Sequence, residues 1–378
     1  MKVKIHKLFE YLLETTSQDR PEAVLGFSQS NSPKLGEFIG DLNPEFRLDW
    51  SNQSFQGLDR LREHVIDRAE LRDTCTADDV LITAGTAEAN YLAIMQLIQP
   101  GDEVIVELPG WPQPTVLGEA IGADLKYLSR DESQGWELDL DQLETLVTSK
   151  TKLIFLCNPN NPTGKMISED QLQKIISIAS KVGAYIIVDE VYAGLEWEGS
   201  RKPSIAGLYE RGITTGSVSK ALGLQGLRTG WLICSDKQLL MDAVILRENS
   251  SEIMNVMGEL IAEIALRKDR YAQAIKVARS EGTANLALLN QFIGSRPELS
   301  WHSPEAGLIG LCRLNLNMDG DSLAQKLLAP PYRTFLLPGS AYKCPQHIRL
   351  GVGGGEAVNL PEGIKRLGQC LDDLAIHI

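Results

Sequence analysis

The 378-residue sequence has no excess of basic residues: 37 Lys and Arg stand against 50 Asp and Glu, which gives a formal net charge of −13 at pH 7. Nucleic-acid binding depends on neutralising phosphates with Lys and Arg. The charge balance therefore argues against a nucleic-acid partner and favours a small-molecule ligand.

The sequence also lacks the patterns of a membrane anchor and of a metal site. No apolar run reaches the roughly 18 residues that a membrane-spanning helix needs. The N-terminal MKVKIHKLFEYLL has neither the apolar core nor the cleavage site of a signal peptide. The six cysteines are scattered, with no CxxC pair and no His-rich spacing that suits zinc. We expect a cytoplasmic protein with reduced thiols, no membrane association and no metal.

Hydrophobic residues make up 43% of the chain and charged residues 23%, which is typical of a globular protein. From Gly57 onward, short apolar runs such as VLITAG and EVIVEL alternate with amphipathic segments such as GLDRLREHVIDRAEL. This pattern is typical of an α/β fold whose mostly parallel, mixed sheet is flanked by helices. We predict a large domain over residues 46–285, and a smaller α+β domain formed by residues 1–45 and 286–378.

Loops that follow the predicted strands carry side chains suited to a ligand, because ligands of such sheets bind at the carboxyl ends of the strands. In TAGTAEAN a helix opens at Gly85, and the N–H groups of Thr86 and Ala87 form an anion site. In LPGWPQP, Trp111 stands between prolines and could stack on a planar ligand. Helix capping and ordinary packing also account for these two loops taken singly.

Two further loops add polar groups at the same edge. NPNNPTG holds Asn161 in a rigid turn made by two Asn-Pro steps. In DEVYAGLEW an apolar strand ends in Asp189, a carboxylate that needs a cation or a donor when it is buried, and Tyr192 follows three residues later. The stretch SVSKALGLQGLRTGW then delivers Lys220 into a glycine-rich turn, with Arg228 eight residues on.

These loops together offer a phosphate cradle, a stacking ring, a buried carboxylate, an amide with a phenol, and a lysine. A cofactor with a phosphate, a basic ring nitrogen, a phenolic oxygen and an aldehyde would use all of them. Pyridoxal 5'-phosphate (PLP) has these groups.

The motifs GLDRLRE, TAGTAEA, PGW, NPNNPTG, DEVY, SVSKALGLQGLRTGW, PGSAY and IRLGVG, in this order, resemble the fold type I PLP-dependent enzymes of the aminotransferase class I/II family. The resemblance extends over nearly the whole chain. It implies the PLP-dependent transferase fold, an α-amino acid substrate and a homodimer with the active site at the interface.

The resemblance also implies a role for each matching residue. Lys220 would anchor the cofactor covalently and then move protons at the substrate Cα, and Asp189 would pair with the ring nitrogen. Arg349 would bind the substrate α-carboxylate. Asn161 would also contact the substrate. The other positions would bind the cofactor: Asn161 and Tyr192 at the phenolic oxygen, Trp111 on the ring, and Gly85, Thr86, Ala87, Ser217, Ser219 and Arg228 at the phosphate.

One position departs from the family, because many relatives have a tyrosine where this sequence has Asn52. That tyrosine reaches the phosphate of the partner subunit, so the departure puts this shared contact in doubt. A second motif, GVGGGE at residues 351–356, is not a dinucleotide fingerprint, because Glu356 replaces its third glycine.

The resemblance leaves open which reaction the enzyme performs once the Cα proton is removed. KLFEYLLE followed by GFSQSNSPKLGEF resembles the start of capreomycidine synthase and related cyclodehydratases, which remove water from a hydroxylated arginine and close a cyclic guanidine. We prefer this reaction, with Glu10 as the carboxylate partner of the guanidinium. The alternative is transamination between an amino acid and a 2-oxo acid. A non-catalytic ligand-sensing domain is disfavoured, because such domains follow a DNA-binding module and this chain is acidic.

Overall fold

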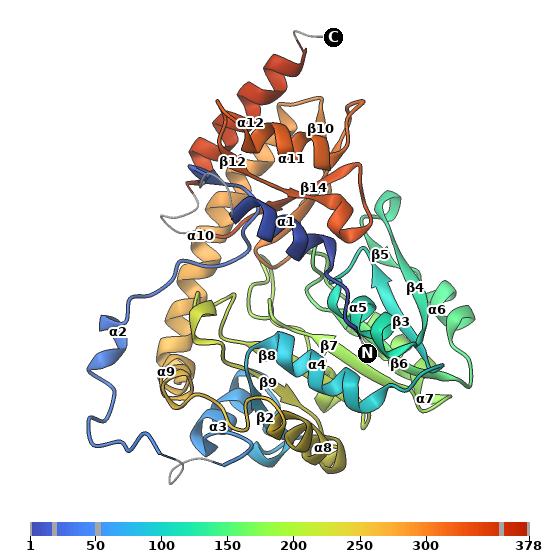
Figure 1. The fold of residues 1–378 in the computed structure, drawn as a ribbon, viewed down its shortest axis with the longest axis vertical. Helices are drawn as coiled ribbons and strands as arrows, with labels where there is room; N and C mark the ends of the chain where they lie inside the picture. The colour runs from blue at the N-terminus through green and yellow to red at the C-terminus, as the bar shows by residue number, and fades with distance from the viewer. Residues whose placement is uncertain (1, 17–20, 50–53, 355–358, 376–378) are drawn as a thin grey trace.

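The computed structural model describes residues 2–16, 21–49, 54–354 and 359–375. Figure 1 shows a larger unit built on an eight-stranded sheet and a smaller unit built on a four-stranded sheet, with the long helix α10 running beside both. No helix among these residues is long and apolar enough to cross a membrane.

The larger sheet is mixed and mostly parallel, so the predicted α/β fold class is confirmed. Its strand order is β2-β9-β8-β7-β6-β3-β4-β5, and β9 runs antiparallel to both of its neighbours. The strands are Val80–Thr83 (β2), Gly230–Ile233 (β9), Gly212–Ser217 (β8), Tyr185–Asp189 (β7), Thr151–Cys157 (β6), Glu103–Leu108 (β3), Asp124–Asp131 (β4) and Glu137–Leu138 (β5).

Helices cover both faces of this sheet, because its central strands are apolar on both sides. In β6, Leu153 and Phe155 point to one face, toward α4, α5 and α8, whereas Ile154 and Leu156 point to the other, toward α6 and α7. The helices are Thr86–Leu97 (α4), Gln113–Ile121 (α5), Leu140–Leu146 (α6), Glu169–Ser180 (α7) and Lys237–Glu248 (α8).

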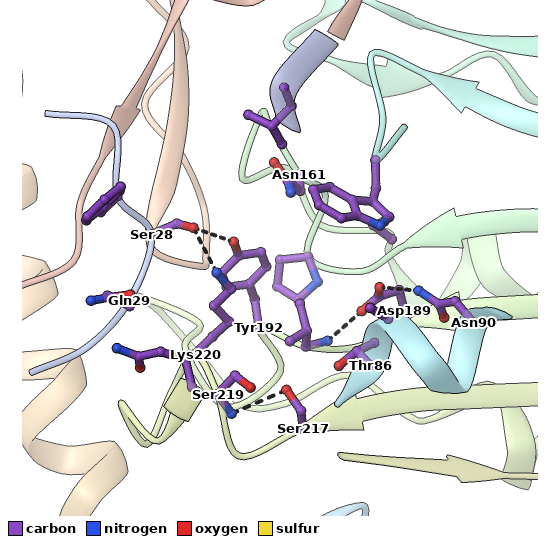
Figure 2. A pocket seen from close by; sticks show the side chains of 18 of the residues that line it. Ser28, Gln29, Thr86, Asn90, Asn161, Asp189, Tyr192, Ser217, Ser219 and Lys220 are labelled. Atoms are coloured by element: carbon purple, nitrogen blue, oxygen red, sulfur yellow. Dashed lines mark hydrogen bonds between the residues drawn. The ribbon is translucent and has the colours of Figure 1, made fainter. Parts of the chain in front are cut away.

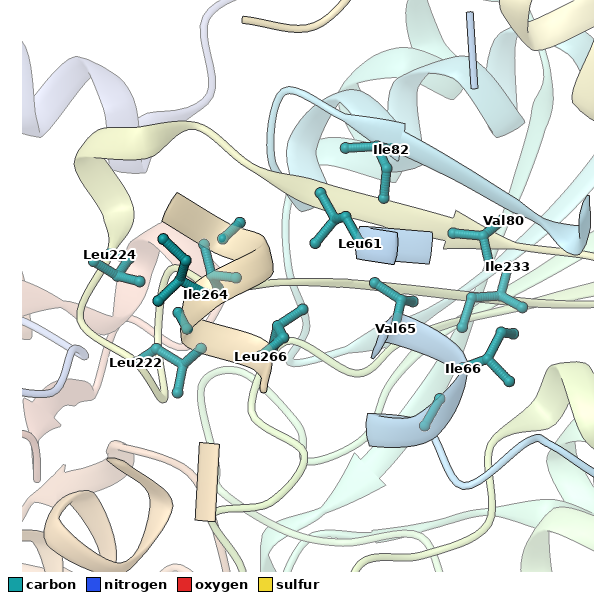
Figure 3. Packing of buried hydrophobic residues seen from close by; sticks show 14 of the residues in the cluster. Leu61, Val65, Ile66, Val80, Ile82, Leu222, Leu224, Ile233, Ile264 and Leu266 are labelled. Carbon is teal, nitrogen blue, oxygen red and sulfur yellow. The ribbon is translucent and has the colours of Figure 1, made fainter. Parts of the chain in front are cut away.

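A further core cluster forms where β2 and β9 meet two helices, α3 (Asp59–Arg68) and α9 (Val256–Leu266). Figure 3 shows Leu61 and Val65 of α3 pointing toward Val80 of β2 and Ile233 of β9. Each of these four side chains is at most 1% exposed, so burying them contributes roughly 1.5–3 kcal/mol apiece. This cluster fixes the glycine-rich Lys220 loop, whose Leu222 and Leu224 pack into it.

The smaller unit is α+β, as predicted, and contains part of the N-terminal segment. Leu25 packs into its core and α1 lies against its C-terminal elements (Figure 1). Its strands are Leu299–Trp301 (β10), Ile309–Leu314 (β11), His347–Gly351 (β14) and Leu337–Pro338 (β13), with Ala23–Val24 (β1) beside Thr334–Phe335 (β12). Its helices are Lys7–Thr16 (α1), Lys268–Gly294 (α10), Gly320–Leu328 (α11) and Leu360–Ala375 (α12).

Two features bear on the expected domain boundaries, which stay a prediction. Position 285 falls inside α10, one uninterrupted helix of 27 residues, so the chain has no linker there. Residues 1–45 are divided between the units: Leu25 packs in the smaller unit, whereas Phe38 of the short helix α2 (Gly36–Ile39) packs in the α3–α9 cluster.

Candidate active site

A cavity of about 360 Å³ lies at the carboxyl edge of the large sheet, with walls from both units. We call it the central cavity. The fold brings nearly all of the predicted site residues to it, because the strands that precede them end at one edge. The predicted residues that line it are Thr86, Ala87, Trp111, Asn161, Asp189, Tyr192, Ser217, Ser219, Lys220, Arg228 and Arg349.

The N-terminus of α4 forms one end of the central cavity and has the groups of an anion site. Its first N–H groups and the helix dipole favour negative charge. The hydroxyl of Thr86 is buried there without a partner among the described residues. Ser217 and Ser219 line the same cavity, and the Ser219 N–H donates to the Ser217 hydroxyl at 3.3 Å. An anion with several oxygens, such as a phosphate monoester, would satisfy these donors.

Gly85 does not line the central cavity but makes room for a guanidinium beside it. Its φ of +82° favours glycine, and an added Cβ would stand 2.5 Å from Nη2 of Arg228. That guanidinium donates to the carbonyl oxygens of Ala84 at 3.0 Å and Gln225 at 3.3 Å. Arg228 thus adds a positive charge to the anion site.

Asp189, the last residue of β7, is a buried carboxylate whose two oxygens already accept hydrogen bonds. Nδ2 of Asn90 donates to one oxygen at 3.0 Å, and the N–H of Val191 donates to the other at 3.1 Å (Figure 2). The hydroxyl of Thr215 donates to Oδ1 of Asn90 at 2.7 Å, which turns the amide nitrogen toward Asp189. Burial raises the pKa of Asp189 to about 6, against the lowering effect of the Asn90 hydrogen bond. A cationic ring nitrogen would stabilise its charged form.

Lys220 projects into the central cavity, whose lining includes the positive charge of Arg349 and the negative charge of Asp189. Burial of its ammonium group, then the positive charge of Arg349, lowers the pKa of Lys220 to about 8, while Asp189 acts in the opposite direction. Its Nζ donates to the Ser28 hydroxyl at 3.4 Å (Figure 2). A lysine with such a pKa is a usable base and nucleophile near neutral pH.

Arg349 on β14 forms the wall opposite α4. One of its Nη atoms donates to the Tyr342 hydroxyl at 2.7 Å and to Oδ1 of Asn161 at 3.3 Å, and the other donates to the Gly26 carbonyl at 2.6 Å. Its Nε is buried with no partner among the described residues. The side chain is therefore held rigidly and keeps donor capacity for a carboxylate.

Two aromatic side chains complete the walls. The indole N–H of Trp111 donates to Gln113 at 3.2 Å, and Gln113 in turn donates to the carbonyl of Ala87 at 2.7 Å, which fixes the ring beside α4. Burial raises the pKa of Tyr192 far above its usual value, so its phenol stays protonated and donates to the Ser28 hydroxyl at 2.9 Å.

Glu10, like Gly85, is a predicted site residue that does not line the central cavity. Leu8 and Leu12 of α1 line the cavity, but Glu10 is exposed. It stands two residues from each, which is about 200° around the helix and hence on the opposite face. The contact of Glu10 with the substrate stays a prediction. Among the described lining residues Asp189 is the one carboxylate.

Sequence reasoning missed Ser28, Asn90, Thr215 and Tyr342. A polar residue in the middle of the apolar helix α4 was a signal for Asn90, and the tyrosine of PGSAY had no role assigned to it. No local pattern marks Ser28, which reaches the site from a segment 192 residues away from Lys220. Asn52 lies outside the described residues.

Comparison with known proteins identifies the family. The model of the family described as aminotransferase class I and II matches residues 51–367. An aspartate aminotransferase from Musicola paradisiaca is 27% identical over 239 residues, which is 62% of this chain and 58% of that protein. The chain spans less than two thirds of the length of the first curated relatives that it matches.

Solved structures match over almost the full length. A PLP-dependent aminotransferase from Streptococcus suis has a TM-score of 0.89 and 28% identity, covering 99% of both chains. A PLP-dependent cyclase, OrfR, has a TM-score of 0.87 and 26% identity, covering 99% of this chain and 98% of that one. The chain belongs to the aminotransferase class I and II family and is an enzyme with the PLP-dependent transferase fold of type I.

Proposed function

We propose that this enzyme removes the Cα proton of an α-amino acid, with Lys220 as the base. The observation that carries the proposal is a lysine whose pKa is lowered to about 8, held in a cavity between a carboxylate and an arginine. PLP, when bound, supplies an electron sink for the electron pair left at Cα. Lys220 would anchor it covalently and, once released, would take the proton.

The polar groups of the central cavity fit the separate parts of PLP. The phosphate would be held by the α4 N-terminus, Arg228 and the two serines, where a buried hydroxyl lacks a partner among the described residues. Asp189 would hold the ring nitrogen protonated, Asn161 and Tyr192 would donate to the phenolic oxygen, and Trp111 would cover the ring.

Capture of the cofactor should depend on pH through Lys220. Only the neutral amine attacks an aldehyde, and the pKa of Lys220 is lowered to about 8. The rate of covalent capture by the cofactor-free protein should therefore rise about tenfold per pH unit below pH 8 and level off above it. Stopped-flow absorbance measures this rate. Asp189→Asn removes a charge that raises the pKa of Lys220, so its midpoint should move to lower pH; an unmoved midpoint contradicts this account.

Arg349 should select substrates by their α-carboxylate. Arg349→Gln removes the charge and one donor of a bidentate pair, so KM for amino acids should rise by about 100-fold, equivalent to about 3 kcal/mol of charge-assisted hydrogen bonding. Cα proton exchange measured by NMR in D₂O gives this KM. The matched control is the corresponding amine without a carboxylate, for which KM should stay within about threefold of its value with the unchanged protein. A uniform loss for both ligands would contradict the assignment.

For the next step, we propose loss of water from a hydroxylated arginine and ring closure to a cyclic guanidine. The support is the N-terminal segment, whose GFSQSN residues enter the central cavity at Ser28 and Gln29, together with the full-length similarity to the cyclase OrfR. With Glu10 outside the cavity, the guanidinium would meet neutral acceptors such as the Gln29 side chain rather than a carboxylate.

Transamination is the second candidate, because the curated relatives and the Streptococcus suis structure are named aminotransferases. It needs the same removal of the Cα proton by Lys220, but no hydroxyl group leaves the substrate and no ring closes. A 2-oxo acid would then bind Arg349 in place of the amino acid.

One experiment separates the two candidates. The holoenzyme is incubated with 3- and 4-hydroxyarginine alone, and separately with common amino acids plus 2-oxoglutarate, and the products are analysed by mass spectrometry. A product lighter by one water, formed without a keto acid, supports cyclodehydration. Formation of glutamate with no water-loss product would reject it in favour of transamination.

The homodimer and the cytoplasmic location expected from the sequence stay predictions. Exposed apolar side chains at Phe55, Met241 and Ile245, which are 51%, 55% and 57% exposed, favour a partner surface on the larger unit. Light scattering on the purified protein measures the assembly.

A further inference from the structure

Residues 26–31, which we call the strap, run between the Lys220 loop and β14. The N–H of Ser30 donates to the carbonyl of Lys220 at 3.1 Å, so the strap is bonded directly to the catalytic lysine's backbone. On the preceding side, the N–H of Gly351 donates to the carbonyl of Leu25 at 2.6 Å. The strap is thus attached to both units.

Three glycines allow the strap backbone to lie against the Lys220 loop and the end of β14. A Cβ added at Gly223 would overlap the carbonyl of Asn31, one at Gly351 that of Phe27, and one at Gly353 that of Gln29. Gly351 and Gly353 belong to GVGGGE, the motif that does not fit a dinucleotide fingerprint. Its glycines have a different use, which is to admit the strap backbone. The position of Ser28 between Phe27 and Gln29 is therefore closely fixed.

The Ser28 hydroxyl accepts two hydrogen bonds but donates none to a described residue. It is 4% exposed and lines the central cavity. Lys220 and Tyr192 both donate to its oxygen, at 3.4 and 2.9 Å (Figure 2). A serine hydroxyl has two acceptor lone pairs and one proton. Both lone pairs are taken, and no described residue accepts the proton, so Ser28 is available to donate into the cavity.

We propose that Ser28 relays a proton from Lys220 to the leaving hydroxyl of the substrate. Lys220 takes the proton when the Cα–H bond breaks. Its ammonium group passes a proton to the Ser28 oxygen, and the Ser28 proton goes to the substrate oxygen as the C–O bond breaks. The electron pair of that bond leaves on the oxygen, and water departs. For a hydroxyl on Cβ, the carbon adjacent to Cα, the elimination is balanced without an oxidant, and Lys220 returns to its neutral form.

This inference rests on the proposed cyclodehydration. It implies that only some steps of the reaction need a proton donor. Removal of the Cα proton needs Lys220 alone. Loss of a hydroxyl needs a proton donor as well, because hydroxide is a poor leaving group. Loss of chloride needs no proton. Ser28 should therefore affect only the loss of a hydroxyl.

The test compares Ser28→Ala with two other variants. Ser28→Thr keeps the hydroxyl, and Ser30→Ala removes a buried hydroxyl of the same strap that has no partner among the described residues. Three rates are measured: Cα proton exchange in D₂O, water loss from 3- and 4-hydroxyarginine, and chloride loss from β-chloroalanine. Cofactor affinity by absorbance titration is the readout that is independent of turnover.

For Ser28→Ala we expect water loss to fall at least about 100-fold, the lower range for a general acid, with exchange and chloride loss within about threefold. Ser28→Thr should recover most of the water loss, and Ser30→Ala should behave as the unchanged protein. Equal losses in all three rates, or cofactor affinity reduced tenfold or more, would overturn the relay, because Ser28 would then only position Lys220 or the cofactor.

The failure of this inference is distinct from failure of the proposed function. If the unchanged protein loses water and Ser28→Ala does so equally fast, only the relay is overturned. If the unchanged protein exchanges the Cα proton but never loses water, both the relay and the proposed cyclodehydration are overturned.

Discussion

Lys220→Ala should reduce Cα proton exchange by more than about 10⁴-fold, the upper range for removal of one acid–base group, because the proposed function makes this residue both base and anchor. The protein should fold, since the side chain lies at a cavity wall and packs in none of the core clusters. The measurements are exchange by NMR in D₂O and the absorbance of bound PLP, which should lose the component that reports covalent attachment.

The matched control is Lys181→Ala, which removes an exposed lysine paired with Glu144 at 2.8 Å on the surface of the larger unit. Its exchange rate should equal that of the unchanged protein, since exposed pairs contribute at most about 1 kcal/mol. Turnover retained by Lys220→Ala would reject the proposed chemistry as a whole, including the Ser28 relay.

The parts of the site that the sequence predicted are those held by a local pattern. Asp189 ends an apolar strand and Thr86 opens a helix, so their places follow from the periodicity of the residues beside them. Parallel strands then bring these ends to one edge without any further information. The fold class followed for the same reason, because the apolar strands must be covered on both faces.

The parts that the sequence did not predict depend on packing between distant segments. Ser28 meets Lys220 only because glycines far along the chain admit the strap. Glu10 is exposed because α1 presents Leu8 and Leu12 to the cavity. The predicted boundary at 285 lies inside α10, a helix whose course past both units the sequence pattern does not show. A helical pattern in the sequence predicts that a helix forms, but it does not predict which face of that helix packs against another part of the chain.

Asp189→Asn should lower Cα proton exchange by roughly 10²- to 10⁴-fold, because removing one partner of a buried charge pair costs about 3–5 kcal/mol. The side chain keeps its shape and loses the negative charge that would hold the cofactor's ring nitrogen protonated. Exchange is measured per cofactor-loaded molecule. The control is Glu190→Gln, which removes the neighbouring buried carboxylate, paired with Arg201 outside the central cavity. Equal losses in the two variants would assign the effect to general destabilisation.

Asp189→Asn should also change how the free energy of unfolding of the cofactor-free protein depends on pH. Burial raises the pKa of Asp189 to about 6 from 3.8, so between these values the folded state binds more protons than the unfolded state. The stability of the unchanged protein relative to Asp189→Asn should therefore fall as pH rises from about 4 to 6, by roughly 1–3 kcal/mol, and stay constant above.

Urea unfolding of both proteins at a series of pH values measures this difference. Saturating PLP should remove the fall, because a protonated ring nitrogen beside Asp189 stabilises the carboxylate that burial alone disfavours. In the cofactor-free state, the stability of the unchanged protein relative to Asp189→Asn could instead rise with pH. That result would contradict the conclusion that burial raises the pKa of Asp189. A fall that persists with PLP would mean that the cofactor's cation does not lie at Asp189.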